Sequence, residues 1–252
     1  MITSVSNARV KQVIQWKTKA KERRKDKVFL IEGAKMFSEA PPDWVQEVYV
    51  SEDYESRTHT GYEVVSNEIF AKMSDTQTPQ GILAVLKQPE YHLEDLLQMP
   101  CPLFVVLENL QDPGNLGTIL RTGEGAGITG VIMSSDTVDI FNPKVIRSTM
   151  GSIYRVPFLY EENLLETIKK LQEKSVKTYA AHLQGKDYYD SFSFREPTAF
   201  LIGNEGNGLT EALSKEAGQY LKIPMEGKVE SLNAGVAAAL LMYEAHRQRN
   251  IS

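Results

Sequence analysis

The chain has 252 residues, of which 42% are hydrophobic and 24% are charged, a composition that is ordinary for a globular protein. One cysteine excludes a framework of intramolecular disulfides, and the four scattered histidines give no recognisable metal-ligand spacing. No apolar run approaches the roughly 18 residues that a membrane span needs, and the N-terminus lacks the apolar core of a signal peptide. We therefore expect a cytoplasmic protein that uses no metal ion.

Net charge argues against nucleic-acid binding, whereas the distribution of charge argues for it. The formal net charge is −5 at pH 7. Nine Lys or Arg residues lie between Arg9 and Lys27, against only Glu22 and Asp26, so this segment carries a charge of +7. Such a cluster in an acidic chain indicates contacts with phosphates, although a solvated helix face followed by a basic loop explains the same pattern.

The first part of the chain alternates helix and strand patterns. Apolar residues at helical spacing predict a helix over 6–19 with Ser6 as its cap, and a second helix is expected over 34–40, where two prolines stop it. Strands are expected at 28–33, 45–50, 62–66 and 81–87. This alternation indicates a small α/β domain. The prolines at both ends of 88–102 mark a linker or a domain boundary.

The second part of the chain alternates strands and helices more strongly. Strands are expected at 103–108, 130–134, 177–181, 199–203 and 220–224. Helices are expected to begin near Asn115, Asn142, Asn163, Gly208 and Ser231. The alternation predicts a mostly parallel sheet that is covered on both faces, and ligands of such sheets gather at the carboxyl ends of the strands.

Three of these strands end in unusual loops, and the first loop opens the stretch "DPGNLGTILRTGEGAG". Its start reads as a turn with Asn115 as a helix cap, which a purely structural role would explain. Arg121 is less easily explained, because a guanidinium that leans back toward the helix start can meet an anionic group lying over the loop.

The second loop lies in "FLIGNEGNGL", residues 200–209. Its glycines let a ligand approach the backbone, but their order is G-x-x-G-x-G rather than the G-x-G-x-x-G of dinucleotide sites, which argues against a nicotinamide cofactor. A turn with a helix cap remains the structural alternative. Glu205 is unusual in such a loop, because its carboxylate would attract a cation or a hydroxyl.

The third loop follows the strand that ends at Ile223-Pro224, and Ser231, Leu232 and Asn233 open a helix after it. Capping alone would explain the serine. The run "AGVAAALLM" is apolar around most of the helix, which indicates burial in the fold or against a second subunit.

Together, in this order and at these separations, the loops resemble the SpoU (TrmH-type) branch of the SPOUT RNA methyltransferases. The matching residues are Asn115, Gly117 and Arg121; Gly203, Asn204 and Glu205; and Ile223, Pro224, Met225, Ser231, Leu232 and Asn233. The segment "SNARVKQV……KERRKDKVFLIEGAKMFSEA" is similar to the small substrate-binding domain, of ribosomal-protein L30e type, that precedes many SpoU catalytic domains. The resemblance covers nearly the whole chain, with Ala8 standing where the family often has proline.

The resemblance implies an α/β fold with two domains. An L30e-like RNA substrate-binding domain is expected at 1–90, a linker at 91–101, and a SpoU catalytic domain with a parallel sheet and a deep trefoil knot at 102–252. It also implies S-adenosylmethionine bound at the knot and a homodimer through the catalytic domain. The residues expected to bind this cofactor are Ala181, His182, Gly203, Asn204, Gly208, Ile223, Met225 and Leu232. A catalytic role of His182 is disfavoured, since a lone histidine there is usually just a strand-end residue.

The implied reaction transfers the methyl group to a ribose 2′-hydroxyl of RNA, most plausibly ribosomal RNA. Arg121 is the family's candidate for activating the hydroxyl, but a guanidinium stays protonated at neutral pH and is a poor base. We therefore expect Arg121 to bind the adjacent phosphate and to stabilise the developing alkoxide. The expected orienting groups are Asn115, Glu205, Ser231 and Asn233.

Contacts with RNA phosphates are expected from Arg9, Lys11, Lys21, Arg23, Arg24, Lys144 and Arg147. For the segment 142–158 a capped helix with a buried face is an equally good explanation, and both can hold.

Three other functions are the alternatives: a transfer-RNA methyltransferase, a non-catalytic RNA-binding or ribosome-assembly factor, and a nucleotide-dependent oxidoreductase. The presence of all the family's polar residues argues against a non-catalytic binding module: Asn115, Arg121, Glu205, Ser231 and Asn233. The absence of the G-x-G-x-x-G motif argues against the oxidoreductase. A role in antibiotic resistance through methylation of large-subunit RNA stays open.

Overall fold

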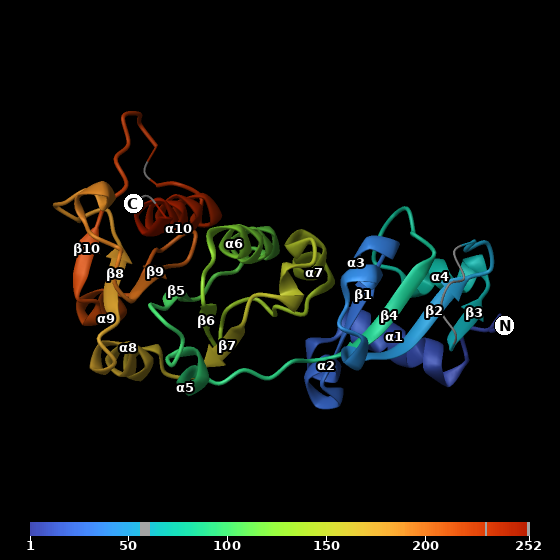
Figure 1. Cartoon of the computed structure of the whole chain (residues 1–252). Coiled ribbons are helices and arrows are strands. Elements are labelled where there is room, and N and C mark those ends of the chain that lie inside the picture. The colour runs from blue at the N-terminus through green and yellow to red at the C-terminus, as the bar shows by residue number, and fades with distance from the viewer. Residues whose placement is uncertain (56–60, 230, 251–252) are drawn as a thin grey trace. The chain divides into compact units, whose positions relative to one another are not determined.

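A computed structural model describes residues 1–55, 61–229 and 231–250. The chain divides into two compact units, each containing one sheet (Figure 1). The first unit comprises Met1–Pro89 and Asp139–Tyr154, and the second comprises Glu90–Val138 and Arg155–Ser252. Among the described helices, none combines the length and the apolar character that crossing a membrane requires.

The first unit contains a mixed four-stranded sheet in the order β1-β4-β2-β3. Its strands are β1 (Val28–Glu32), β2 (Val45–Ser51), β3 (Tyr62–Val65) and β4 (Ile82–Lys87). Both β1 and β2 pair antiparallel with β4, and β3 runs parallel to β2. The helices of this unit are α1 (Ala8–Thr18), α2 (Ala20–Asp26), α3 (Ala34–Glu39), α4 (Asn67–Met73) and α7 (Pro143–Thr149), with short 3-10 turns at Pro42–Trp44 and Ser152–Tyr154.

The two faces of this sheet are covered from different parts of the chain. Apolar side chains of α1 and α4, among them Val13 and Phe70, pack with Tyr49 in one core cluster. On the other face, the fully buried Phe29 of β1 meets the ring of Phe141 with 5.0 Å between the ring centroids. Residues 139–154 therefore belong to the first unit because they bury a sheet face that would otherwise be exposed.

The second unit contains a six-stranded sheet in the order β10-β8-β9-β5-β6-β7, and all its pairings are parallel. Its strands are β5 (Leu103–Leu107), β6 (Gly130–Ser134), β7 (Phe158–Glu161), β8 (Lys177–Ala181), β9 (Thr198–Ile202) and β10 (Gln219–Leu221). Its helices are α5 (Leu93–Leu96), α6 (Pro113–Ala126), α8 (Leu164–Glu173), α9 (Glu211–Glu216) and α10 (Ala234–Asn250), with a 3-10 turn at Tyr189–Ser191.

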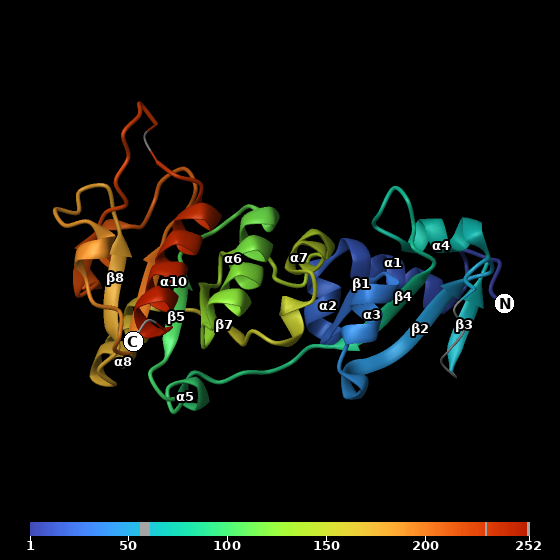
Figure 2. The same ribbon diagram turned by 45° about the horizontal axis from the view of Figure 1, so that its top comes forward.

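Helices cover both faces of this sheet (Figure 2). Side chains of α5, α8 and α9 share one core cluster with strand residues such as Phe104 and Leu201. Helices α6 and α10 lie side by side over the other face, and a Cβ atom at Gly125 of α6 would lie 3.0 Å from the Tyr243 hydroxyl of α10. A Cβ atom at Gly123 of α6 would lie 2.3 Å from Cδ1 of Ile128 and 3.5 Å from the Met242 sulfur of α10.

The predicted strands and helices are present in both units, with differences at their ends. The structure adds β7, α2 and α4, which the sequence did not indicate, and a helical turn, α5, inside the expected linker 91–101. That turn is part of the second unit because Leu93 and Leu96 are buried in its core. The functional boundaries at 90 and 102 and the trefoil knot stay predictions.

Three predicted helix caps were wrong. Asn7, not Ser6, caps α1, because its side chain accepts from the Arg9 amide. Asp112, not Asn115, caps α6, and its Oδ1 accepts from the Asn115 amide at 2.7 Å. α10 begins at Ala234 rather than near Ser231, and Asn233 bonds its first turn. The Asn115 side chain does not cap because it bonds Glu205 and Asn233 instead.

Candidate active site

The three unusual loops meet at one edge of the second unit's sheet. Because β5, β9 and β10 run parallel, their carboxyl ends lie on the same side, and each of the three strands is followed by one loop. Strands β5 and β9 are direct neighbours, which brings the loop after Leu107 beside the loop after Ile202. The topology alone therefore explains why segments separated by almost a hundred residues share a site.

Glu205 joins the second loop to the first. Its Oε1 accepts hydrogen bonds from the Asp112 amide and from the Asn115 side chain, both at 3.0 Å, and its Oε2 accepts from the Gln111 amide at 3.1 Å. The neighbouring Asn204 adds a fourth link, since its Nδ2 donates to the Asn109 carbonyl at 2.8 Å. A carboxylate that accepts several N–H donors is held in one position.

Asn115 joins the first loop to the third. The residue is buried, and while its Nδ2 donates to Glu205, its Oδ1 accepts from Nδ2 of Asn233 at 2.8 Å. Asn233 in turn accepts the amide of Val236 at 3.2 Å, which fixes the start of α10. Glu205, Asn115 and Asn233 thus form one chain of hydrogen bonds across all three loops, hereafter the three-loop network.

The three-loop network also sets the acidity of Glu205. Burial by itself would raise the pKa of its carboxyl, but hydrogen bonds from the Asn115 side chain and from backbone amides, including those of Asp112 and Gln111, outweigh burial and lower the pKa below its ordinary value. The carboxylate is therefore ionised at neutral pH and acts as an acceptor, not as an acid.

A pocket of about 370 Å³ opens between the second and third loops, a volume in the usual range for small-molecule sites. All eight residues expected to bind the cofactor line it: Ala181, His182, Gly203, Asn204, Gly208, Ile223, Met225 and Leu232. Glu205 and Ser231 line it as well, whereas Asn115 and Asn233 reach it only through their hydrogen bonds to Glu205 and to each other. The assignment of these residues to a bound molecule stays a prediction.

Gly203 shows why the pocket needs a bare backbone. A Cβ atom there would lie 2.0 Å from the carbonyl carbon of Gly208 and 2.1 Å from the amide nitrogen of Leu209, so any side chain would displace the opposite side of the loop. That loop is closed by reciprocal backbone bonds between Asn204 and Gly208 at 3.0 and 2.9 Å. Gly208 adopts a φ of +70°, which favours glycine.

His182 has a structural environment in this pocket. Its Nδ1 accepts from the Gln184 amide at 3.1 Å, and its ring stacks on Tyr220 with 5.1 Å between centroids. Leu183 and Gln184 also line the pocket, and no sequence pattern marks these residues, or Tyr220 behind His182, as part of a site.

Arg121 stands on α6, six residues after Asn115, with an exposed side chain. Within the described part of the chain no hydrogen bond or ion pair of its guanidinium is present. Among the same residues, no cluster of His, Cys, Asp or Glu is arranged to hold a metal ion. The guanidinium is thus a free cation close in sequence to the three-loop network.

The cations expected to contact RNA fall into two groups. Lys11, Lys21, Arg24 and Lys144 are exposed, whereas Arg9 pairs with Glu63 at 2.5 Å and Arg147 pairs with Asp75 at 2.6 Å. The prediction for Arg23 is wrong, because its side chain is only 4% exposed and forms an ion pair with Asp139 at 2.5 Å. A guanidinium buried in this way cannot reach a phosphate at the surface.

Comparison with known proteins decides the class of the site. The SpoU rRNA Methylase family matches residues 102–243, and the MRM3-like substrate binding domain matches residues 7–84. The chain belongs to the SpoU rRNA Methylase family. This confirms the predicted family, the α/β fold class, the enzyme class of RNA methyltransferases and S-adenosylmethionine as the cofactor.

Relatives of similar length exist among both sequences and structures. The 23S rRNA (guanosine(2553)-2′-O)-methyltransferase RlmP of Bacillus subtilis is 37% identical over 248 residues, covering 96% of this chain and 97% of the relative. The SpoU methyltransferase AviRb from Streptomyces viridochromogenes, solved with AdoMet, superposes with a TM-score of 0.89 at 26% identity over 96% of this chain and 98% of its own. An AdoMet-bound rRNA methyltransferase from Sinorhizobium meliloti superposes with a TM-score of 0.88 at 29% identity. The match covers 100% of this chain and 98% of the relative.

Gly203→Ala is expected to weaken S-adenosylmethionine binding about tenfold or more, because the added methyl overpacks the Gly208–Leu209 backbone at a cost of about 1–3 kcal/mol. Isothermal titration calorimetry measures the affinity. Gly227→Ala is the matched control, since no atom lies within 4 Å of its Cβ position. Unchanged affinity in Gly203→Ala would contradict the role of this glycine.

The lowered pKa of Glu205 predicts a pH-dependent contribution to stability. A carboxyl whose pKa is lower in the folded state stabilises the fold fully above its unfolded value of about 4.5, and this contribution disappears as the pH falls through the folded value. We expect Glu205→Gln to melt below the wild type at about pH 7, and the gap to narrow below about pH 4.5. Thermal melting across this pH range measures the difference in melting temperature between the variant and the wild type. Glu226→Gln, at an exposed residue, is the control. A difference in melting temperature that stays constant with pH would count against the three-loop network.

Proposed function

We propose that this protein transfers the methyl group of S-adenosylmethionine to a ribose 2′-hydroxyl of 23S ribosomal RNA. The observation that supports this most is the three-loop network beside the pocket, which brings the polar residues of all three motifs together at one sheet edge. The substrate follows the Bacillus subtilis relative, whose name gives a guanosine of 23S rRNA and which matches this chain over nearly its full length.

The pocket fits the cofactor by its chemistry as well as its volume. Gly203 and Gly208 expose backbone, Ile223 and Leu232 supply apolar walls, and Asn204 supplies a polar group. These residues would hold S-adenosylmethionine, whose sulfonium supplies an activated methyl group. Gly203 keeps the wall of this pocket in shape, because a Cβ atom there would displace the Gly208–Leu209 backbone on the opposite side of the loop.

Arg121 would act on the RNA side of the reaction. Methyl transfer requires in-line attack by an oxygen about 3 Å from the methyl carbon, so positioning of the ribose supplies much of the rate. A free, protonated guanidinium can bind the neighbouring phosphate and stabilise negative charge as the hydroxyl loses its proton. Asn115, Glu205, Ser231 and Asn233 would orient the loops and the ribose around it.

The first unit would bind RNA outside the target nucleotide. The exposed Lys11, Lys21, Arg24 and Lys144 are the strongest candidates for phosphate contacts, while Arg9 and Arg147 would have to exchange an acidic partner for a phosphate. The target ribose must enter a site at the sheet edge, so the nucleotide would come from a loop or be splayed out of a helix. With ribosomal RNA as its substrate, the protein would act in the cytoplasm.

A homodimer through α10 completes the proposal. Val236, Leu240 and Tyr243 are 48%, 38% and 49% exposed and recur on one face of this helix. Spacings of three and four residues produce a continuous apolar stripe, which favours a protein partner over solvent. A second copy of the chain is the partner that the family resemblance implies.

Transfer of tritium from methyl-labelled S-adenosylmethionine to in vitro transcribed 23S rRNA tests the function, and mapping of 2′-O-methyl sites should begin at the guanosine named for the Bacillus subtilis relative. We expect Arg121→Ala to lower the transfer rate about 10²- to 10³-fold, the usual effect of removing a group that stabilises an oxyanion, with cofactor affinity unchanged. Near-full turnover by Arg121→Ala would refute its role. Methylation of transfer RNA alone, or of no RNA, would refute the proposed substrate or the activity.

Leu240→Glu is expected to convert the dimer into monomers, because it places a charge in the centre of the apolar stripe. Sedimentation velocity at micromolar concentration measures the assembly state. Val229→Glu changes an exposed apolar residue outside α10 and serves as control. A wild-type protein that sediments as a monomer would overturn the dimer proposal.

A further inference from the structure

Residues 139–154 connect two strands of the second unit but fold with the first. They lie in sequence between β6 and β7, and the boundaries between the units fall at 89/90, 138/139 and 154/155. The chain therefore passes between the units three times.

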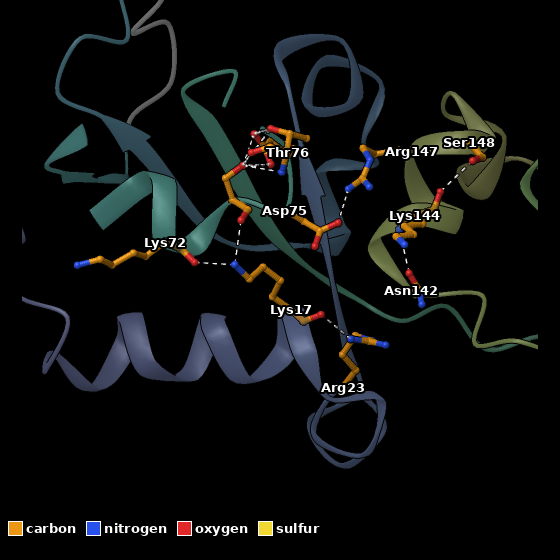
Figure 3. A network of polar contacts seen from close by, with 11 residues as sticks. Lys17, Arg23, Lys72, Asp75, Thr76, Asn142, Lys144, Arg147 and Ser148 are labelled. Carbon is orange, nitrogen blue, oxygen red and sulfur yellow. Dashed lines mark hydrogen bonds and ion pairs between the residues drawn. The ribbon is translucent and has the colours of Figure 1, made fainter. Parts of the chain in front are cut away.

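The Arg23–Asp139 ion pair attaches the start of this segment and is far less exposed than the Arg147–Asp75 pair. The side chains of Arg23 and Asp139 are 4% and 18% exposed, and Nε and Nη2 of the guanidinium both donate to Oδ2 of the carboxylate. Nη1 of Arg23 donates to the Trp16 and Lys17 carbonyls, the second of which Figure 3 shows. Oδ1 of Asp139 accepts the Phe141 amide at 3.1 Å.

Three further attachments hold the rest of the segment. Arg147 of α7 reaches Asp75, in the loop before β4 (Figure 3). The Tyr154 hydroxyl donates to the Met36 carbonyl at 2.9 Å, and the ring of Phe141 packs on Phe29. Because the Arg147–Asp75 pair is over a third exposed on both sides, it contributes little by itself.

The stretch just before Asp139 is bonded to the loop that carries the first motif. The Val138 amide donates to the Leu110 carbonyl at 2.8 Å, the Gln111 side chain donates to the Asp136 carbonyl at 2.7 Å, and the Asn109 amide donates to Ser134 Oγ at 2.8 Å. The amides of Gln111 and Asp112 then donate to Glu205. Asp139 is thus the sequence neighbour of Val138, which bonds Leu110, and Leu110 directly precedes Gln111, a donor to Glu205 of the three-loop network.

We propose that Arg23 and Asp139 are a positioning pair for RNA methylation: by holding residues 139–154 on the substrate-binding unit, they keep the loop 109–112 in the geometry that methyl transfer needs. The inference rests on the methyltransferase function proposed above. Neither residue touches RNA or cofactor. The pair acts through the chain at 138/139, so its loss lowers the rate of the chemical step and leaves cofactor affinity intact.

Asp139→Asn tests the pair, since it removes the charge and retains the size of the side chain. We expect the single-turnover rate of methyl transfer to in vitro transcribed 23S rRNA, at saturating RNA, to fall roughly 10- to 100-fold, the usual cost of misplacing a reacting group by about 1 Å. Affinity for S-adenosylmethionine should stay within about twofold. Arg23→Lys keeps the positive charge but loses the planar guanidinium with its several N–H donors. The methyl-transfer rate of this variant should also fall, but by less than that of Asp139→Asn.

Hydrogen exchange at the Gln111 and Asp112 amides is the readout that a merely structural pair would not change. In Asp139→Asn without RNA, both amides should exchange faster than in the wild type. They lie almost thirty residues from the substitution in sequence, and each donates a hydrogen bond to Glu205 rather than to Asp139. Glu68→Gln, which breaks the exposed ion pair with Lys72 in the same unit, is the control and should change neither amide nor rate.

The outcomes separate this inference from the proposed function. A wild-type protein that methylates no RNA refutes the function, and the exchange of the Gln111 and Asp112 amides still decides whether the pair positions the loop. Unchanged exchange at these amides, or a rate within about twofold of wild type, overturns the inference. If Asp139→Asn does not fold, as loss of one partner of a buried pair can cause, Arg23→Lys provides both measurements under the same criteria.

Discussion

The carboxylate of Glu205 accepts hydrogen bonds from two backbone amides and one side chain of the loop after β5, and the same asparagine that donates to it accepts from Asn233 at the start of α10. If one loop moved, these groups would lose their hydrogen-bond partners. The loss would be costly, because leaving the buried side-chain amide of Asn115 unpaired raises the free energy of the folded state. The loops are therefore held as one assembly, and the geometry of the pocket beside them follows.

The site combines a fixed part and a free part. Glu205, Asn115 and Asn233 are engaged with one another, and Gly203 is too tightly packed to admit a side chain. Arg121, on the same helix as Asn115, is exposed and has no partner among the described residues. The helix that carries Asn115 of this preorganised frame thus also carries an unpaired cation, and preorganised charged groups stabilise charge as it develops.

Much of the second unit was predictable from local sequence. Strands such as 130–134 and 177–181 have the predicted bounds, since short apolar runs between turns specify parallel strands, and the parallel sheet then places the eight predicted cofactor residues around one pocket. Pairing over long sequence distances was not predictable. The basic run from Arg9 to Lys27 does not reveal that Arg23 is buried against Asp139, or that residues 139–154 cover a sheet face of the first unit. The linker prediction missed α5 for the same reason, because Leu93 and Leu96 are ordered by a core formed elsewhere in the chain.

A double-mutant cycle tests the three-loop network most directly. Glu205→Gln, Asn233→Ala and the double variant would be compared by calorimetric titration with S-adenosylmethionine. If Asn115 connects both residues into one network, either change breaks it, and the loss of binding free energy in the double variant should be smaller than the sum of the single losses by about 0.5–3 kcal/mol. Losses that add within about 0.3–0.5 kcal/mol would show that the loops act independently and would contradict this account of the site.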